Sequence, residues 1–203
     1  MSRLRQRSDA GQAFPIYITV VGGLLLLALA YFAVGQAAAT RSEAQTAADA
    51  AALAAALETR DQLADQWLTN VLDPDVWQAI FDGKVPVPSA CWRAHELAAS
   101  NNASVTCHPE GPLGYTVVAE TNETVGDSIV PGTEDQKATE SATAVVEARC
   151  SFDLPADNAG EDVLPSLSCK GEEWDLSPDD LVDLPKPEDL FDVHLADSQA
   201  NDE

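Results

Sequence analysis

Basic side chains are scarce in this chain of 203 residues, which has 11 Lys and Arg against 34 Asp and Glu. Its formal net charge is -23. A protein that binds nucleic acid neutralises the phosphates with clustered Lys and Arg. The composition therefore excludes nucleic acid as a partner.

Motifs of the common enzyme classes are also missing. The sequence has no G-x-S-x-G, no H-E-x-x-H, no Walker loop and no G-x-G-x-x-G. The histidines His95, His108 and His194 are the ready general bases near neutral pH, and none lies in a nucleophile or metal motif. The sequence predicts no catalytic residue, no metal and no cofactor, and so a protein that is not an enzyme.

Charge is absent from one long stretch, because no charged residue lies between Asp9 and Arg41. Within it, residues 14–35 are almost entirely apolar and would span about 33 Å as a helix, close to the ~30 Å hydrocarbon core of a bilayer. A cleavable signal would have a shorter apolar region and a small-residue cleavage site. We predict an uncleaved anchor over residues 13–36, with membrane lipid as its surroundings.

The orientation of this anchor follows from the flanking charges. Arg3, Arg5 and Arg7 lie in a short basic leader, residues 1–12, and the sequence after the anchor is strongly acidic. Lys and Arg are enriched on the cytoplasmic side of membrane helices. We expect a cytoplasmic N-terminus and an extracytoplasmic chain from about residue 37 onward.

All four cysteines, Cys91, Cys107, Cys150 and Cys169, lie beyond the anchor. An even number of cysteines in an exported region is typical of a disulfide framework. Four cysteines allow three connectivities, and proximity in the sequence favours Cys91 with Cys107 and Cys150 with Cys169. A zinc site built from Cys91, Cys107 and their histidine neighbours matches no usual ligand spacing.

Residues 37–72 contain neither Gly nor Pro and are dominated by Ala, Leu, Gln and Glu. These are good helix formers, so one helix is predicted from Pro15 to Leu72, with Gly35 and Thr40 as the places where it would break. A stripe of small residues lets another helix approach closely, both in water and in lipid. The alternative is an Ala-rich stalk without contacts. The residues predicted to carry helix assembly are Gly22, Gly23, Ala47, Ala48, Ala51, Leu53, Ala55 and Leu57.

The rest of the chain predicts a small α+β domain followed by a tail. Turn residues and apolar patterns predict helices over 74–82 and 90–99, a hairpin of strands over 103–107 and 115–120, and a third strand over 141–150. We take residues 73–150 as a small disulfide-stapled α+β domain. Residues 151–203 are acidic and rich in Pro, which predicts a mostly disordered tail. Phe191, Val193 and Leu195 are the tail residues that could dock on a partner or on the sheet.

The N-terminal third resembles a known family. Residues 7–13 read RSDAGQA, the apolar span follows, and Ala47 to Ala56 read AADAAALAAA. This arrangement resembles the TadG-like and TadE-like proteins of the tight-adherence (Flp, type IVc) pilus system, especially the actinobacterial ones. The resemblance implies a protein anchored beside the pilus assembly machinery, with the remainder of the chain facing outward. The predicted helix and antiparallel strands are similar to the small pilin-like domains of such proteins.

One difference from the pilin pattern bears on processing. In prepilins and pseudopilins of this kind a Gly precedes the cleavage point and a Glu stands five residues further on. Gly11 with Gln12 provides the leader cleavage candidate, but the fifth residue after Gly11 is Ile16. A charge inside lipid is retained when it has a partner, and Ile16 offers none. An anchored accessory protein is therefore preferred to a processed minor pilin.

The sequence thus predicts a single-pass structural or accessory component of a Flp-type pilus or a related secretion apparatus. Its expected partners are other membrane proteins of that apparatus, with self-association as a further expectation. The alternative function is a membrane-tethered module that binds a cationic ligand or a cell-wall component. Under the leading hypothesis, bulky residues at Ala51 and Ala55 should abolish the partner contacts.

Overall fold

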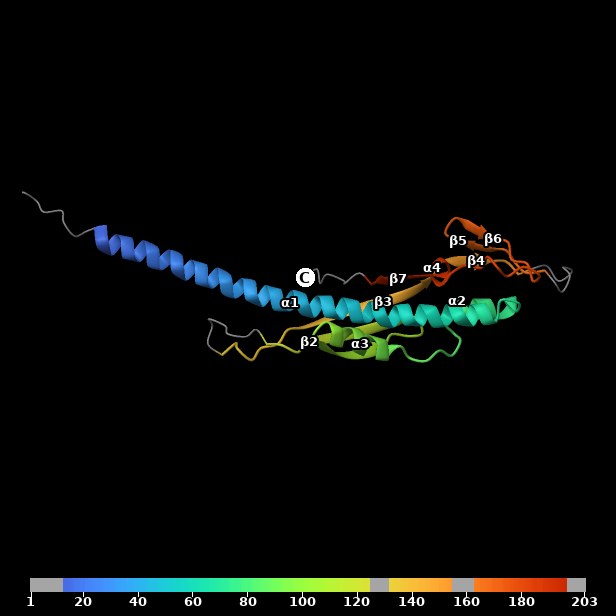
Figure 1. Cartoon of the computed structure of the whole chain (residues 1–203), viewed down its shortest axis with the longest axis horizontal. Helices are drawn as coiled ribbons and strands as arrows, with labels where there is room; N and C mark the ends of the chain where they lie inside the picture. Colours follow the sequence, from blue (N-terminus) through green and yellow to red (C-terminus); the bar gives the residue numbers. More distant parts are fainter. Residues whose placement is uncertain (1–12, 125–131, 155–162, 197–203) are drawn as a thin grey trace, which may run out of the picture.

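The computed structural model describes residues 13–124, 132–154 and 163–196, with the backbone alone for Ala13 and Phe14. The leader arginines and the candidate cleavage point Gly11–Gln12 lie outside the described residues. The described chain forms one long helix with a small α+β domain folded around its outer half (Figure 1). The predicted α+β class is confirmed.

Helix α1, Ala13–Thr69, is unbroken over 57 residues, which corresponds to about 85 Å at the usual rise. The helix passes through Gly35 and Thr40 without a break, and the Thr40 hydroxyl donates to the carbonyl of Gln36 at 3.2 Å. It ends at Thr69, and the backbone N–H of the next residue, Asn70, donates to the carbonyls of Gln66 and Trp67. The prediction of one continuous helix is confirmed.

The outer half of α1 forms the centre of the hydrophobic core. Seven of its alanines are fully buried, and this half of the helix packs mainly against two strands of the sheet and one short helix. Alanine has no side chain beyond Cβ, so the sheet approaches the helix backbone closely. Residues with 0% exposure are Ala44, Ala47, Ala48, Ala51, Ala52, Ala55 and Ala56.

The main sheet has four antiparallel strands in the order β1-β2-β3-β7. The strands are β1 Ala103–Pro109, β2 Gly114–Thr121, β3 Thr139–Ala148 and β7 Phe191–Leu195. Alternate side chains of β2 and β3 face α1, among them Val117 and Ala144, which are fully buried. The expected hairpin of the first two strands and the expected third strand are confirmed.

Three short helical segments complete the predicted part of the fold: η1 Pro74–Val76, α2 Trp77–Phe81 and α3 Cys91–Ser100. Both helices expected here are present, within one or two residues of the predicted bounds. After α2 the chain turns at Gly83, where φ is +66° and an added Cβ would lie 2.7 Å from Cδ2 of Leu113. A larger residue would therefore be strained there.

The expectation of a disordered tail is wrong for residues 163–196. Strands β4 Cys150–Phe152, β5 Leu167–Cys169 and β6 Glu172–Trp174 form a second antiparallel sheet, followed by helix α4 Pro187–Leu190 and strand β7. Apolar residues are few in this segment, but Leu167, Leu190 and Phe191 are almost fully buried. Strand β7 also pairs with β3, so Phe191 and its neighbours dock on the sheet, which is one of the two places that the sequence left open for them.

An aromatic cluster holds the tail against the end of α1 that lies furthest from the N-terminus. The rings of Trp67 and Trp77 are 5.4 Å apart, and Phe152 lies 5.2 Å from Trp77. Phe81 contacts both Phe152 and Phe191. Each such pair contributes roughly 0.5–1.5 kcal/mol beyond its buried area. The cluster therefore joins α1, α2, β4 and β7.

Candidate functional site

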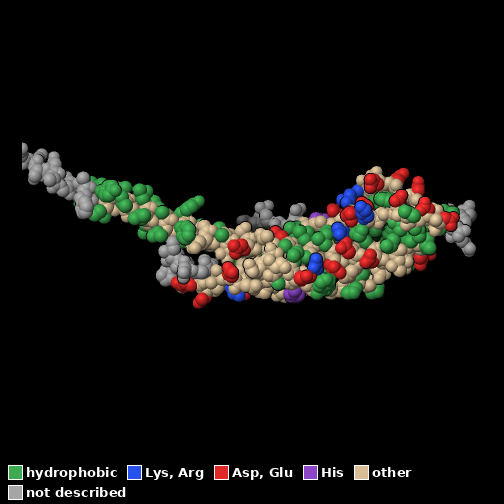
Figure 2. Space-filling view, viewed as in Figure 1, with side chains coloured by type: hydrophobic (Ala, Val, Ile, Leu, Met, Phe, Trp, Pro, Cys, Tyr) green, Lys and Arg blue, Asp and Glu red, His purple; other side chains and the backbone are tan. Residues whose placement is uncertain are grey.

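The N-terminal half of α1 carries apolar side chains with nothing packed on them. Its most apolar 18-residue window has a mean hydropathy of 2.3 and is 0% buried. Leu25, Leu29 and Phe32 are each more than half exposed. Figure 2 shows this end of α1 projecting from the domain as a hydrophobic rod, and we call residues 15–35 the apolar rod. Among the described residues it is the one helix long and apolar enough to cross a membrane. This surface needs lipid or other protein around it.

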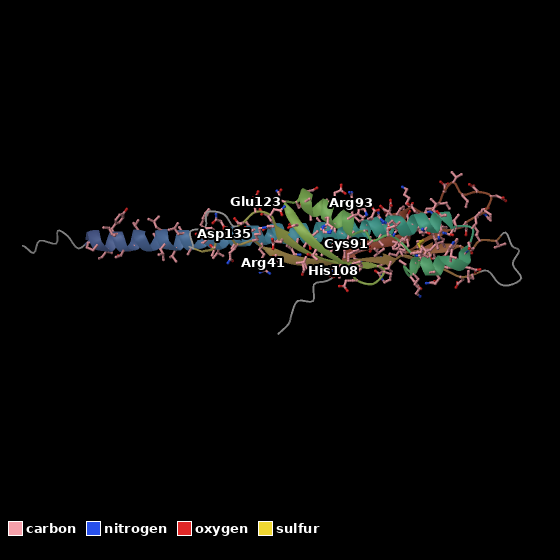
Figure 3. All side chains as sticks on the ribbon, turned by 90° about the horizontal axis from the view of Figure 1, so that it is seen from below. Arg41, Cys91, Arg93, His108, Glu123 and Asp135 are labelled. Carbon is pink, nitrogen blue, oxygen red and sulfur yellow. A yellow bond between two sulfur atoms is a disulfide. The ribbon has the colours of Figure 1, made fainter. Side chains whose placement is uncertain are left out.

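The change from exposed to folded helix takes place over a short distance. The first buried side chain on α1 is Ala44, nine residues after Gly35, or about 14 Å along the axis. Between them stands Arg41, which pairs with Glu140 of β3. Figure 3 shows Arg41 at the end of the domain that faces the apolar rod, together with Glu123 and Asp135. The domain therefore begins close to where the apolar helix ends.

The residues predicted to carry assembly fall into three groups. Ala47, Ala48, Ala51 and Ala55 have 0% exposure, so they contact this chain's own sheet and α3. The prediction that these alanines contact another protein is therefore wrong. A stripe of small residues allows close approach either by a partner helix or by the chain's own sheet, and here the sheet and α3 take that place.

The other two groups remain accessible. Gly22 and Gly23 lie on the apolar rod with open space where a Cβ would be. Leu53 is half-buried, and Leu57 is 38% exposed. Helix contact with a partner stays a prediction for these four residues.

Leu53 and Leu57 line a groove between α1 and α3, which we call the α1–α3 groove. Its volume is about 430 Å³. The floor is apolar and the rim carries charges of both signs: Ala50, Leu53, Ala54, Leu57 and Leu97 form the floor, and Glu58, Arg60, Asp61 and Arg93 form the rim. Sequence reasoning found the two leucines but missed the groove, because α3 is needed to form its second wall.

Two smaller hollows lie nearer the apolar rod on α1. One, of about 170 Å³, is lined by Ser42, Glu43, Thr46 and Asn101. The other, of about 310 Å³, is lined by Glu43, Ser100, Asn101, Asn102, Thr121 and Glu123. Both meet at Glu43 and Asn101, so the hollowed surface continues from the end of the rod toward the α1–α3 groove.

The four cysteines form the two disulfides that proximity favours. Cys91 bonds Cys107 and ties α3 to β1, and Cys150 bonds Cys169 and ties β4 to β5. A disulfide-bonded cysteine offers no thiolate to a metal, so the zinc alternative is wrong. The described ranges contain no group of three His, Cys, Asp or Glu that could hold a metal ion.

Two polar contacts at the surface of the domain involve aspartate side chains. His194 Nδ1 is 3.9 Å from an Asp192 carboxylate oxygen, and both side chains are more than 40% exposed. Hydrogen bonds from Lys84 and then Gln78 hold the pKa of Asp82 below its usual value of 3.8. Asp82 directly follows α2 on the surface, and its hydrogen bonds with Lys84 and Gln78 stabilise the end of this helix.

Comparison with known proteins supports the expected resemblance. Residues 11–58 match the model of the family described as putative Flp pilus-assembly TadE/G-like. No curated protein and no solved structure matches the chain. The matched segment covers the apolar rod and the alanines buried in the core, up to the floor of the α1–α3 groove.

Proposed function

We propose that this chain, whose residues 11–58 are TadE/G-like, is a membrane-anchored component of a Flp-type pilus assembly apparatus. It acts without catalysis, as a structural or accessory protein. Its partners are other membrane proteins of that apparatus, with self-association as a further contact.

The observation that carries this proposal is the division of α1 into two halves with opposite surroundings. Residues of the first half, such as Leu25 and Phe32, are exposed and apolar, whereas Ala48 and Ala55 of the second half are fully buried in the domain. Because no break separates the halves, the domain is fixed rigidly to the anchor. A protein built in this way holds a folded domain at a set distance from the bilayer.

The orientation we propose places the domain outside the cytoplasm. The three leader arginines favour a cytoplasmic N-terminus. Two disulfides in the domain fit an oxidising compartment. Both features support the same side of the membrane for the domain.

Retention in the membrane is the fate we propose, in preference to cleavage and polymerisation. Ile16 stands where a processed pilin would have a carboxylate, and its side chain is 64% exposed on the apolar rod. An apolar residue at this position suits contact with lipid and provides no charge to register neighbouring subunits.

Replacement of Leu25 and Leu29 by Arg tests the anchoring function. Two arginines near the centre of the span cost about 2.5 to 3.5 kcal/mol each on insertion. In a strain that lacks the native gene, the full chain should restore surface pili and the double arginine variant should not. The matched control carries Ile at both positions and should restore pili. Equal pilus numbers with all three chains would contradict the proposal.

A further inference from the structure

The α1–α3 groove is aligned with the membrane anchor along one helix. Positions at seven-residue spacing connect them without interruption: Gly22, Leu29, Gln36, Glu43, Ala50 and Leu57 form one series, and Leu25, Phe32, Ala39, Thr46 and Leu53 form the second. None of these side chains is buried. Two series offset by three residues have the spacing by which a second helix follows the first in a left-handed supercoil. Small or apolar residues stand at both ends of each series, and the polar residues Gln36, Glu43 and Thr46 lie between them.

This seam lies on the face of α1 that the domain leaves open. Successive residues are 100° apart around a helix, so Leu57 lies about 200° from Ala55, whose side chain packs in the core. The domain covers one face of α1, and α3 forms a wall beside the opposite face. A helix that leaves the bilayer beside the anchor would reach the groove without changing direction.

The floor of the groove is suited to a helix. It is apolar, and Leu57 in its lining is 38% exposed. Removing such side chains from water favours association. The small residues Ala50 and Ala54 let the backbone of a neighbouring helix come close.

Charge defines the kind of helix that fits. The leader carries three Arg and Asp9, which is a net charge of +2. Since the whole chain has a net charge of -23, residues 13–203 carry a net charge of -25. On the rim, Arg60 pairs with Asp61, and Arg93 pairs with Glu96 outside the groove. No cation of the described residues pairs with Glu43, Glu58 or Glu123. Glu43 is exposed, and Glu58 is half-buried and accepts a hydrogen bond from the side chain of Gln62 at 3.1 Å. Neither carboxylate is neutralised by a cation, so both attract a basic partner, and the total charge repels a second copy.

We propose that the α1–α3 groove receives a basic, amphipathic helix of a second single-span membrane protein, which leaves the bilayer beside α1. This inference rests on the anchoring function proposed above. It adds which surface of the chain binds a partner and what charge and shape that partner has. Leu53 and Leu57 contact the apolar face of that helix, and Glu43 and Glu58 face its cations.

A photocrosslinking experiment with the full chain tests the proposal. Benzoylphenylalanine is placed at Leu57 and, as the control, at Val118 on the outer face of the sheet, which is 37% exposed against 38% for Leu57. The chain is inserted into phosphatidylcholine vesicles with a synthetic single-span peptide whose apolar span continues into roughly three Leu/Ala heptads flanked by Lys. A second peptide carries Glu in place of Lys.

We expect the basic peptide to crosslink at Leu57 about tenfold more than at Val118, and about tenfold more than the acidic peptide does at Leu57. Leu53→Glu in the chain should remove this crosslink, while Val118→Glu should leave it intact. Equal yields at the two positions, or equal yields with the two peptides, would overturn the proposal. A crosslink at Leu57 mainly to a second copy would assign the groove to self-association instead.

Flotation of the vesicles separates failure of this proposal from failure of the anchoring function. A chain that does not float with the lipid contradicts the anchoring function itself. A chain that floats but gives no crosslink at Leu57 contradicts the groove proposal alone. Recovery of the two native disulfide pairs from the Leu53→Glu variant, by peptide mapping without reductant, shows that the domain has folded.

Discussion

The hydroxyl of Thr59 donates a hydrogen bond to the phenol oxygen of Tyr115 at 2.9 Å, inside the hydrophobic core. The same oxygen accepts the backbone N–H of Ala90 at 3.2 Å. Thr59 is 0% exposed and Tyr115 is 4% exposed. This single oxygen therefore links α1, strand β2 and the residue that precedes α3.

Removing the Tyr115 hydroxyl should cost more stability than removing that of Thr59. Tyr115→Phe leaves the N–H of Ala90 and the hydroxyl of Thr59 without their acceptor, a loss of about 1–3 kcal/mol for each unsatisfied buried group. Thr59→Val removes one donor and leaves Tyr115 with Ala90, at about 1 kcal/mol. Denaturant unfolding of the full chain in detergent, followed by tryptophan fluorescence, measures the free energy of unfolding of both variants. A larger loss in Thr59→Val than in Tyr115→Phe would mean that the hydrogen bonds to the Tyr115 oxygen contribute little.

Neighbouring alanines on α1 should respond differently to the same substitution. Ala51 is 0% exposed against the sheet, whereas Ala50 is half-buried and lines the α1–α3 groove. Ala51→Leu should overpack the core and cost about 1–3 kcal/mol. Ala50→Leu should leave the stability of the domain nearly unchanged. Unfolding midpoints of the two variants, measured side by side, check this difference, and similar midpoints would contradict the placement of Ala51.

Loss of either disulfide should destabilise the domain by a similar amount. Cys91 and Cys107 are 16 residues apart in the sequence, and Cys150 and Cys169 are 19 apart. Loops of this length correspond to about 3 kcal/mol in the chain-entropy model. Urea unfolding of a variant in which both cysteines of one pair are replaced by Ser measures the loss in free energy of unfolding for that disulfide. Peptide mapping without reductant should recover these same two pairs, and any crossed pair would contradict the fold.

The pKa of Asp82 should lie below 3.8 and should rise in Lys84→Met. In the native protein Lys84 and Gln78 donate to this carboxylate at 2.8 and 2.9 Å. Because the folded-state pKa is lowered, the stabilisation is present above the unfolded value of 3.8 and is lost as the pH falls through the folded value. NMR titration of the Asp82 carboxyl carbon measures this pKa in the native protein and in Lys84→Met. An unchanged pKa in Lys84→Met would contradict the assignment of Lys84 as the main cause.

The sequence was sufficient to predict the elements that depend on neighbouring residues. The absence of Gly and Pro over residues 36–72 predicted the long helix, and the turn after Pro109 predicted the hairpin. The disulfide pairing followed from proximity, because each pair joins elements close in the chain.

Contacts between distant parts of the chain were less predictable. A stripe such as Ala47, Ala51 and Ala55 shows that something approaches the helix closely, but it does not distinguish a partner helix from the chain's own sheet. The pairing of β7 with β3 joins residues about 45 positions apart in an acidic segment where few apolar residues indicate a core. The α1–α3 groove depends on two elements at once, so no pattern within α1 alone reveals it.

The proposed function requires that this chain stays in the membrane as an anchored assembly component. Intact mass and N-terminal sequencing of the native protein, from the membrane and from material sheared off the cell surface, test it most directly. We expect a chain that keeps Arg3, Arg5 and Arg7 and remains in the membrane fraction. A chain that begins at Gln12 and is found in the sheared material would contradict the proposed function and identify a processed pilin.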